Sequence, residues 1–474
     1  MKKIFLLTVL LFSVLSASAQ TNTVVSRHNL RQEISRVFFR AQQASNAAAS
    51  PAVQADQKFA STPEVATSSL TSDDLIRKIQ RAYISRKPSV RPEKQWQIAL
   101  FLADTNRPLS ETLGILRKKI TEGTLRHAAV LDISPRAKKR QTQKENPAAA
   151  QEYPAVFYFL YMGQKKPITE KIYADSTVDA PDQLAPLFEH FQNTQDVYSA
   201  AIIDGHGSGF DMFYGENGWL DMEQILSSLQ GAGLSLDVLN LASCHMGSLY
   251  NLHQLAQYKN VAYLVASSDI MTGNSERTYY TLLQHLNAAP RQAAINAAAS
   301  ARKVHHFDDS YSTNNVIALH LPGLFTPVQN WFNDYGRVML AGSARLQKDM
   351  LQVFDPRWGT WRSLNKILRR QTEYLLNSQE KLEWNGYELP ELKQNCIQSA
   401  RILEEALREN TLTQWCYSEQ LGRVYVDQIP PNIDCLDGVS VTKKQLEYLV
   451  ETETPALEKQ LEKQYRLSRL RFLM

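Results

Sequence analysis

The stretch "SAAIIDGHGSGF" (residues 199–210) decides the fold, because an apolar strand pattern ends there at a histidine between two glycines. A second stretch, "LDVLNLASCHMG" (residues 236–247), is also an apolar strand pattern, and it runs directly into Cys244. Residues 221–230, which lie between them, have the pattern of a helix. A strand, a helix and a second strand in this order predict two neighbouring parallel strands joined by a crossover helix.

The segments around this unit repeat the same alternation of strands and helices. Apolar strand patterns also occupy residues 96–104, 127–134, 155–162 and 261–267, and helical patterns occupy residues 110–120, 182–191 and 246–256. We therefore predict an α/β fold with a largely parallel sheet that helices cover on both faces. In such sheets functional residues gather at the carboxyl ends of the strands, which is where His206 and Cys244 lie.

The two ends of the chain differ in character from this central region, which we place at residues 94–325. Residues 1–19 combine two lysines, an apolar run and a final Ala-Ser-Ala, which is the pattern of a signal peptide. Residues 20–93 are rich in Ala, Ser, Thr, Gln and Pro, and they predict a flexible arm or pro-segment. Residues 326–474 carry long helical patterns and predict a mainly α-helical C-terminal region.

Composition and charge limit the kinds of partner that the protein could bind. A net charge of +4 is small for 474 residues and gives no basis for binding nucleic acid. Beyond the signal peptide the sequence has no further run of about 18 apolar residues, so no membrane span is predicted after signal removal. We expect an exported protein that is periplasmic or secreted.

Four cysteines in an exported chain raise the question of disulfides. If Cys244 is a free thiol, at most one bridge can form among the other three, and we expect it between Cys416 and Cys435 rather than with Cys396.

The chemistry that suits this edge of the sheet is attack by a thiolate. A cysteine becomes a nucleophile when a base such as an imidazole lies nearby, and His206 and Cys244 would meet at one rim of the sheet. The backbone N–H groups of Gly207 and Cys244 would then form an oxyanion hole. Taken alone, a cysteine after a strand is usually part of the core, and a histidine in a glycine turn usually has a structural role. His245 is a rival base, but adjacent side chains point apart.

These segments together resemble the clostripain family of cysteine peptidases, which belongs with gingipains, legumain and caspases. The resemblance covers residues 96–321. It rests on "YSAAIIDGHGSGF" for the family's H-G-x-G strand, "LDVLNLASCHMGSLYNLHQLA" for its nucleophile turn, "VAYLVASSD" for the next strand and "NNVIALHLPGL" for a later one. It implies a caspase-like fold, a catalytic dyad of His206 and Cys244, and a peptide or protein substrate.

The resemblance also implies where substrate specificity is set. Ala242 stands where the family has an acid that selects a basic residue on the acyl side of the cut, so the preferred residue is open. Ser267, at the end of the following strand, and Asp269, two residues later, are further substrate-binding candidates, and Asp269 would supply a negative charge. Metal motifs such as CxxC or HExxH are absent, so no metal or cofactor is predicted. Some family members need calcium, but no D-x-D-x-D-G loop is present here.

Three functions remain compatible with the sequence. The first is an exported cysteine endopeptidase that hydrolyses peptide bonds through a Cys-His dyad. The second is a catalytically silent relative that binds peptides or a partner at the cell surface. The third is a transferase or ligase on the same fold. Because the chain retains both reacting residues, His206 and Cys244, the endopeptidase is the function that we expect.

Overall fold

The structure is a computed structural model of all 474 residues. It describes residues 94–103, 109–133, 155–174, 184, 186–188, 190–193, 196–213, 219–268, 271, 275–300, 316–352, 361–413, 415–418, 422–425 and 438–473. Contacts divide the chain into Met1–Val53 and Gln54–Met474, and every described residue belongs to the second unit. The predicted signal peptide (1–19) and arm (20–93) lie outside the described residues.

The described part of the chain is organised around a nine-stranded sheet with the order β15-β11-β10-β9-β5-β1-β2-β3-β4. Its strands, in chain order, are β1 Gln95–Leu102, β2 Leu125–Asp132, β3 Ala155–Met162, β4 Pro167–Ala174, β5 Val197–Asp204, β9 Leu236–Ala242, β10 Val261–Ser267, β11 Val316–His320 and β15 Thr411–Thr413. The five strands from β10 to β2 in this order are mutually parallel, and the remaining strands at both edges are antiparallel. The predicted fold class is therefore confirmed.

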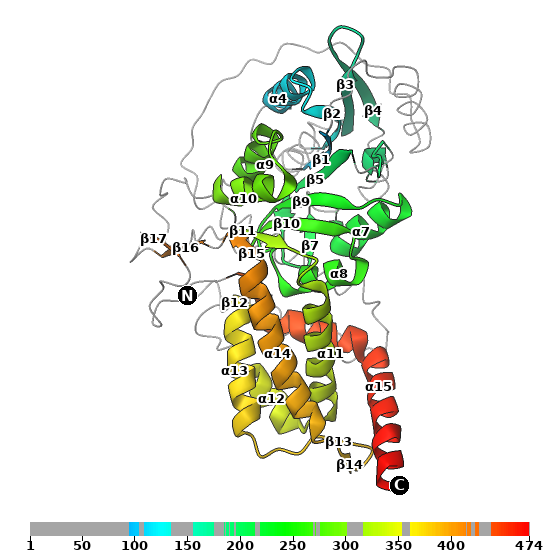
Figure 1. The fold of residues 1–474 in the computed structure, drawn as a ribbon, viewed down its shortest axis with the longest axis vertical. Coiled ribbons are helices and arrows are strands. Elements are labelled where there is room, and N and C mark those ends of the chain that lie inside the picture. The colour runs from blue at the N-terminus through cyan, green and yellow to red at the C-terminus, as the bar shows by residue number, and fades with distance from the viewer. Residues whose placement is uncertain are drawn as a thin grey trace, which may run out of the picture. The chain divides into compact units, whose positions relative to one another are not determined.

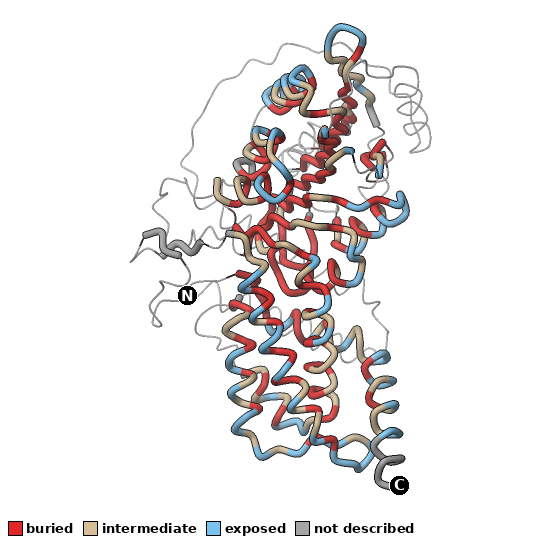
Figure 2. The backbone as a smooth tube through the Cα atoms, in the orientation of Figure 1, coloured by how far each residue is buried: buried red, intermediate tan, exposed pale blue. Residues whose placement is uncertain are grey.

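Helices cover both faces of the sheet because its strands are apolar on both sides. One face packs against α4 (Leu109–Thr121), α9 (Ser275–Gln284) and α10 (Pro290–Ser300). The other face belongs to a separate apolar cluster that includes α7 (Met222–Gly231) and α8 (Leu249–Tyr258). Figure 1 shows the two groups of helices on opposite sides of the strands, and the central strands are buried along their length in Figure 2. A sheet covered in this way needs continuous apolar strands, which the sequence provides.

The C-terminal region is mainly helical, as predicted. Its helices are α11 Phe325–Ala341, α12 Ala344–Gln352, α13 Leu364–Asn377, α14 Glu391–Asn410 and α15 Lys443–Leu473. Helix α11 packs against α8 of the central region and against α14 and α15, so one apolar cluster runs from the sheet into these helices. Strand β15 directly follows α14 and pairs with β11, which adds a C-terminal strand to the main sheet. The division at residues 94–325 and 326–474 stays a prediction, because the two segments share this core.

Several short strands lie outside the main sheet. The ones that matter for function are β6 (His206–Gly207), β7 (Asp211–Phe213) and β8 (Trp219–Asp221), which form a small antiparallel sheet directly after β5. Strand β18 (Ser440–Thr442) pairs with β12 (Trp361–Ser363) and leads into α15. Two further hairpins join β13 (Glu383–Trp384) to β14 (Tyr387–Glu388) and β16 (Trp415–Ser418) to β17 (Gly422–Tyr425).

Sequence patterns missed several elements of the central region, including α9. Strand β4 pairs with the predicted strand β3 along its whole length, but its sequence "PITEKIYA" mixes charged and apolar residues as an edge strand does. Helix α10 was also missed, because its buried residues are four alanines and a proline rather than large apolar side chains. Of the helices in the described part of the chain, none has the length and apolarity that crossing a membrane requires.

Candidate active site

The pairing of β5 with β9 brings His206 and Cys244 to the same edge of the sheet. These parallel strands keep a constant offset of 38 residues up to their last pair, Asp204 with Ala242 (242 − 204). His206 and Cys244 have the same offset (244 − 206), and each lies two residues beyond that last pair. Since neighbouring strands are about 5 Å apart, the two residues leave the sheet side by side.

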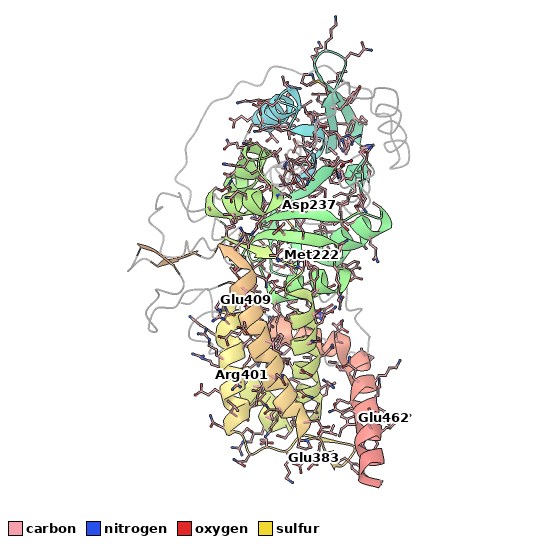
Figure 3. The ribbon with its side chains drawn as sticks, in the orientation of Figure 1. Met222, Asp237, Glu383, Arg401, Glu409 and Glu462 are labelled. Atoms are coloured by element: carbon pink, nitrogen blue, oxygen red, sulfur yellow. The ribbon has the colours of Figure 1, made fainter. Side chains whose placement is uncertain are left out.

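A half-buried carboxylate fixes this register at the opposite end of the strands. Asp237 Oδ2 accepts the Ser199 backbone N–H at 2.7 Å and the Ser199 hydroxyl at 3.2 Å. Burial raises the pKa of Asp237, and the hydrogen bonds from Ser199 oppose that rise because they favour the carboxylate. Figure 3 labels Asp237 on its strand. Ser199 and Asp237 also differ by 38 residues, so a slip of one strand past the other would break both bonds.

His206 opens a tight hairpin, which we call the histidine hairpin (residues 206–213). Ser208 closes it: its N–H donates to the Asp211 carbonyl at 3.0 Å, and its hydroxyl oxygen accepts the N–H groups of Phe210 and Asp211 at 3.3 and 3.2 Å. Gly209 at the tip has φ +85°, a left-handed conformation that glycine adopts without strain. The hairpin thus has a fixed shape, with the half-buried His206 at its base.

Cys244 lies in a second tight segment, which we call the cysteine turn (residues 243–248). The Ser243 N–H donates to the Leu241 carbonyl at 2.8 Å, which closes a γ-type turn directly before the thiol. His245, directly after it, has φ +58°, an uncommon left-handed conformation for a residue with a side chain. Cys244 is 6% exposed. Strained backbone of this kind is concentrated at functional sites.

The helix after the cysteine turn begins later than the sequence indicates. We expected a helix over residues 246–256, whereas α8 begins at Leu249 with Ser248 as its N-cap. The reason is that Gly247 is held between two strands: its N–H donates to the Ser267 carbonyl at 2.7 Å and its carbonyl accepts the Ser440 N–H at 2.9 Å. The helix N-terminus therefore lies several residues beyond the thiol.

The histidine hairpin and the cysteine turn touch through their backbones. A Cβ built on Gly207 would lie 2.1 Å from the Cys244 carbonyl oxygen and 3.1 Å from its carbon. Real Cβ atoms are essentially never found this close to another atom, so only glycine fits at position 207. This approach is direct evidence that the segments that carry His206 and Cys244 meet.

The thiol has a backbone partner that sequence analysis did not identify. The Met271 N–H donates to Cys244 Sγ at 3.1 Å, from the segment that follows β10. Met271 is buried in the same apolar cluster as Cys244 and Ala242. A hydrogen bond to sulfur favours the thiolate over the neutral thiol, because it stabilises the charged form.

His245 is too weak a base to carry a proton at neutral pH. Burial lowers the pKa of His245 to about 4, and the hydrogen bond with the Ser268 backbone only partly offsets this. At neutral pH the ring is therefore uncharged, and it cannot provide the imidazolium that a Cys-His pair uses as an acid. His206 remains the predicted partner of Cys244, and the residue after it, Gly207, lies against the Cys244 carbonyl.

The predicted pocket residues lie beneath the surface or outside the described residues. Ala242 and Ser267 are fully buried at the ends of β9 and β10, and Asp269 lies outside the described part of the chain. Their role in substrate binding stays a prediction. The described residues contain no group of three or more His, Cys, Asp or Glu side chains placed to hold a metal ion.

The remaining cysteines bear on the predicted disulfide. Cys396 is a free thiol buried in α14, where burial raises its pKa. Cys435 and the side chain of Cys416 lie outside the described residues, so the predicted pair stays untested.

Comparison with known proteins gives matches of structure alone. No protein-family model and no curated protein sequence matches the chain. A secreted C11 cysteine protease from Bacteroides thetaiotaomicron, "iotapain", has a TM-score of 0.47 and 12% identity over 77% of this chain and 98% of its own. An inactive zymogen C11 protease from Parabacteroides distasonis has a TM-score of 0.47 and 8% identity over 77% and 97%.

In fold, the chain is similar to C11 cysteine proteases. A third match is a secreted C11 protease from Bacteroides thetaiotaomicron bound to an irreversible peptide inhibitor, with a TM-score of 0.44 and 13% identity over 74% of this chain and 92% of its own. C11 proteases are the clostripain family, so the family named from the sequence is also the family of these structural neighbours.

The C-terminal region contributes contacts to the site that sequence analysis missed. Residues of β18 and the first turn of α15 bond to both the histidine hairpin and the cysteine turn. The local signal was present, since Thr442 and Gln445 have the spacing of a capping box before an apolar run. Nothing local indicates that the Gln445 side-chain amide donates to a glycine more than 230 residues earlier.

Proposed function

We propose that the protein is an exported cysteine endopeptidase in which Cys244 is the nucleophile and His206 the acid and base. The observation that carries this proposal is the backbone contact between Gly207 and Cys244, which leaves no room for a side chain between the two segments. A thiolate and an imidazole at one rim of a sheet suit acyl transfer to cysteine.

The proposed reaction proceeds in two steps. The Cys244 thiolate attacks the peptide carbonyl carbon, and the His206 imidazolium donates a proton to the leaving amine as the C–N bond breaks. A water molecule then attacks the thioester while His206 takes its proton, which releases the carboxylic acid and restores the thiolate. His245, whose pKa is about 4, has no part in these proton transfers.

Hairpin geometry supports Gly207 as a donor to the oxyanion. Ser208 and Asp211 form a hydrogen-bonded pair, because the Ser208 N–H reaches the Asp211 carbonyl. Hydrogen-bonded and non-hydrogen-bonded pairs alternate in antiparallel strands. The next pair, Gly207 with Met212, is therefore a non-hydrogen-bonded pair, and the Gly207 N–H points away from β7. Together with the Cys244 N–H it would bind the oxygen of the tetrahedral intermediate.

The residue preferred at the cut depends on which charges the substrate pocket offers. Ala242 offers no charge, so selection of a basic residue would need another acid, for which Asp269 is the candidate.

One observation favours a second candidate, a catalytically silent protein that binds peptides. Cys244 is 6% exposed and its sulfur already accepts the Met271 N–H, so a substrate carbonyl has to displace or pass the segment around Met271. A silent protein would keep this arrangement permanently, whereas a peptidase would open it when substrate binds.

The test compares cleavage of a mixed-sequence peptide library by the wild type and by Cys244→Ala, read by mass spectrometry. We expect cuts that only the wild type makes, and we expect iodoacetamide to modify Cys244 much faster than Cys396. Cys396 is an internal control, because burial raises its pKa and it lies outside the proposed site. Identical library patterns together with a slowly reacting Cys244 would instead establish the silent binding protein.

A further inference from the structure

Three segments that are far apart in the sequence meet at one carbonyl group, that of Gly209. Gly209 O accepts the hydroxyl of Ser248 at 2.6 Å and the side-chain amide of Gln445, Nε2, at 2.9 Å. Gly209 is the tip of the histidine hairpin, Ser248 ends the cysteine turn, and Gln445 lies in the first turn of α15. Ser248 and Gln445 are both fully buried or nearly so, at 1% and 0% exposed.

The other polar atoms of Gln445 are also engaged, which fixes the orientation of its amide. Gln445 Oε1 accepts the Thr442 N–H at 3.1 Å, and Thr442 Oγ1 accepts the Gln445 N–H at 3.1 Å, which is a capping box. With Oε1 held by Thr442, Nε2 must be the atom that faces Gly209. The start of α15 is thus a rigid donor aimed at the histidine hairpin.

Neighbouring bonds tie the same C-terminal segment to the cysteine turn. The Ser440 N–H donates to the Gly247 carbonyl at 2.9 Å, and Ser440 forms a parallel bridge with Ser248. The Ser268 hydroxyl, at the end of β10, donates to the Gly438 carbonyl. Residues 438–445, which we call the C-terminal brace, therefore contact each of the segments that follow β5, β9 and β10.

We infer that Gln445 is a positioning residue for the dyad, acting on His206 through the Gly209 carbonyl. This inference rests on the proposed function. The hairpin tip is tied to α8 by Ser248 and to α15 by Gln445, so the base of the hairpin, with His206, keeps a fixed place relative to Cys244. Without the Gln445 donor the Gly209 carbonyl loses one of its two bonds, and Ser248 alone then holds the hairpin tip at this carbonyl. Small misplacements of a reacting group reduce rates by up to about 10²-fold.

The first experiment compares Gln445→Met with Thr442→Val. Both variants break the capping box and weaken the start of α15, but only Gln445→Met removes the donor to Gly209. For peptide cleavage we expect Gln445→Met to lower kcat by about 10- to 100-fold with little change in KM. We expect Thr442→Val to retain wild-type kcat. Equal kcat values for the two variants would overturn the inference, because the effect would then be general helix stability.

A second variant covers the case in which Gln445→Met does not fold. In Gln445→Glu the new side chain keeps an acceptor for the Thr442 N–H. Burial raises the pKa of a carboxyl group, and its protonated form can donate to Gly209 O. We expect kcat of this variant, relative to the wild type at each pH, to rise as the pH is lowered from 8 to 6. A ratio that stays constant over this range would contradict a role for the donor.

Hydrogen exchange separates failure of this inference from failure of the proposed function. In Gln445→Met the amides of residues 207–211 should exchange faster than in Thr442→Val, whether or not the protein cleaves peptides. If the wild type shows no cleavage that depends on Cys244, the proposed function fails and exchange alone decides whether Gln445 orders the hairpin. Unchanged exchange at residues 207–211 would overturn the inference in either case.

Discussion

Gly207→Ala should abolish most of the peptide cleavage and leave a protein that still folds. The added methyl group would lie 2.1 Å from the Cys244 carbonyl oxygen, and the opposing atoms belong to backbone that cannot rotate away. The histidine hairpin and the cysteine turn must therefore move apart. We expect kcat to fall at least about 10²-fold, since displacement of reacting groups by about 1 Å has effects of this size. Overpacking of this kind lowers the free energy of unfolding by about 1–3 kcal/mol.

Gly114→Ala is the matched control for this substitution. Gly114 lies on the exposed side of α4, and a Cβ there meets nothing within 4 Å. Alanine should raise the free energy of unfolding by about 0.5–1 kcal/mol, because glycine in a helix interior loses more backbone entropy on folding. Its cleavage rate should equal that of the wild type. Cleavage rates and urea unfolding curves for both variants check the prediction, and full activity in Gly207→Ala would show that the close approach is not needed.

Acidification should unfold the protein between pH 6.5 and about 4, because buried histidines cannot take up protons in the folded state. Burial lowers the pKa of His190, His245 and His253 to about 4, and it lowers the pKa of His127 well below the usual value. The charges of His190 and Arg126 lower the pKa of His127 further. In the unfolded chain all four would titrate near 6.5.

The sign of the effect follows from proton binding. Between about pH 4 and 6.5 the unfolded chain holds more protons than the folded one, so the free energy of unfolding falls as the pH falls through this window. His190 and His253 are each shifted by about 2.5 pKa units, which corresponds to about 3 kcal/mol per residue at the acid end. These two residues alone would remove a large part of a typical stability of about 5–15 kcal/mol. Above pH 6.5 the effect disappears.

His253→Leu isolates one of these residues. His253 lies on α8 with its ring 4.5 Å from that of Phe332 on α11, and neither ring nitrogen has a hydrogen-bond partner in the described part of the chain. Leucine has a similar volume and needs no partner, so stability at pH 7.5 should be equal or higher. The loss of stability between pH 6.5 and 4.5 should be smaller than in the wild type. Urea unfolding at several pH values checks this, and an identical pH dependence in the two proteins would contradict it.

The positions of the central strands along the chain could be predicted from the sequence because each is a continuous apolar run, whereas their order in the sheet was not predicted. Five parallel strands buried on both faces leave a signal that needs no knowledge of the tertiary structure. The edge strands were harder: β4 has a mixed pattern, and β15 is a segment of three residues that joins the sheet from beyond α14. Such segments form strands because a neighbouring strand has backbone groups free to pair with them.

The placement of His206 and Cys244, the proposed dyad, at one edge of the sheet could likewise be predicted from the sequence. His206 and Cys244 follow two strands whose lengths and connection set an offset of 38 residues, and the structure has that same offset. The close approach of Gly207 to the Cys244 carbonyl was not predicted, and the role of the Gly207 N–H in an oxyanion hole stays a prediction.

Only the tertiary structure decided what surrounds the thiol. The Met271 N–H on Cys244 Sγ and the Gln445 amide on Gly209 join residues 27 and 236 positions apart in the chain. Backbone N–H and carbonyl groups are the same at every residue. The residue type of the partner therefore gives no sign that its backbone makes such a bond. The burial that lowers the pKa of His245 could not be predicted from the sequence either, because it depends on which segments pack over the ring. The sequence by itself determined which groups can react, and packing between distant segments determined how they are held.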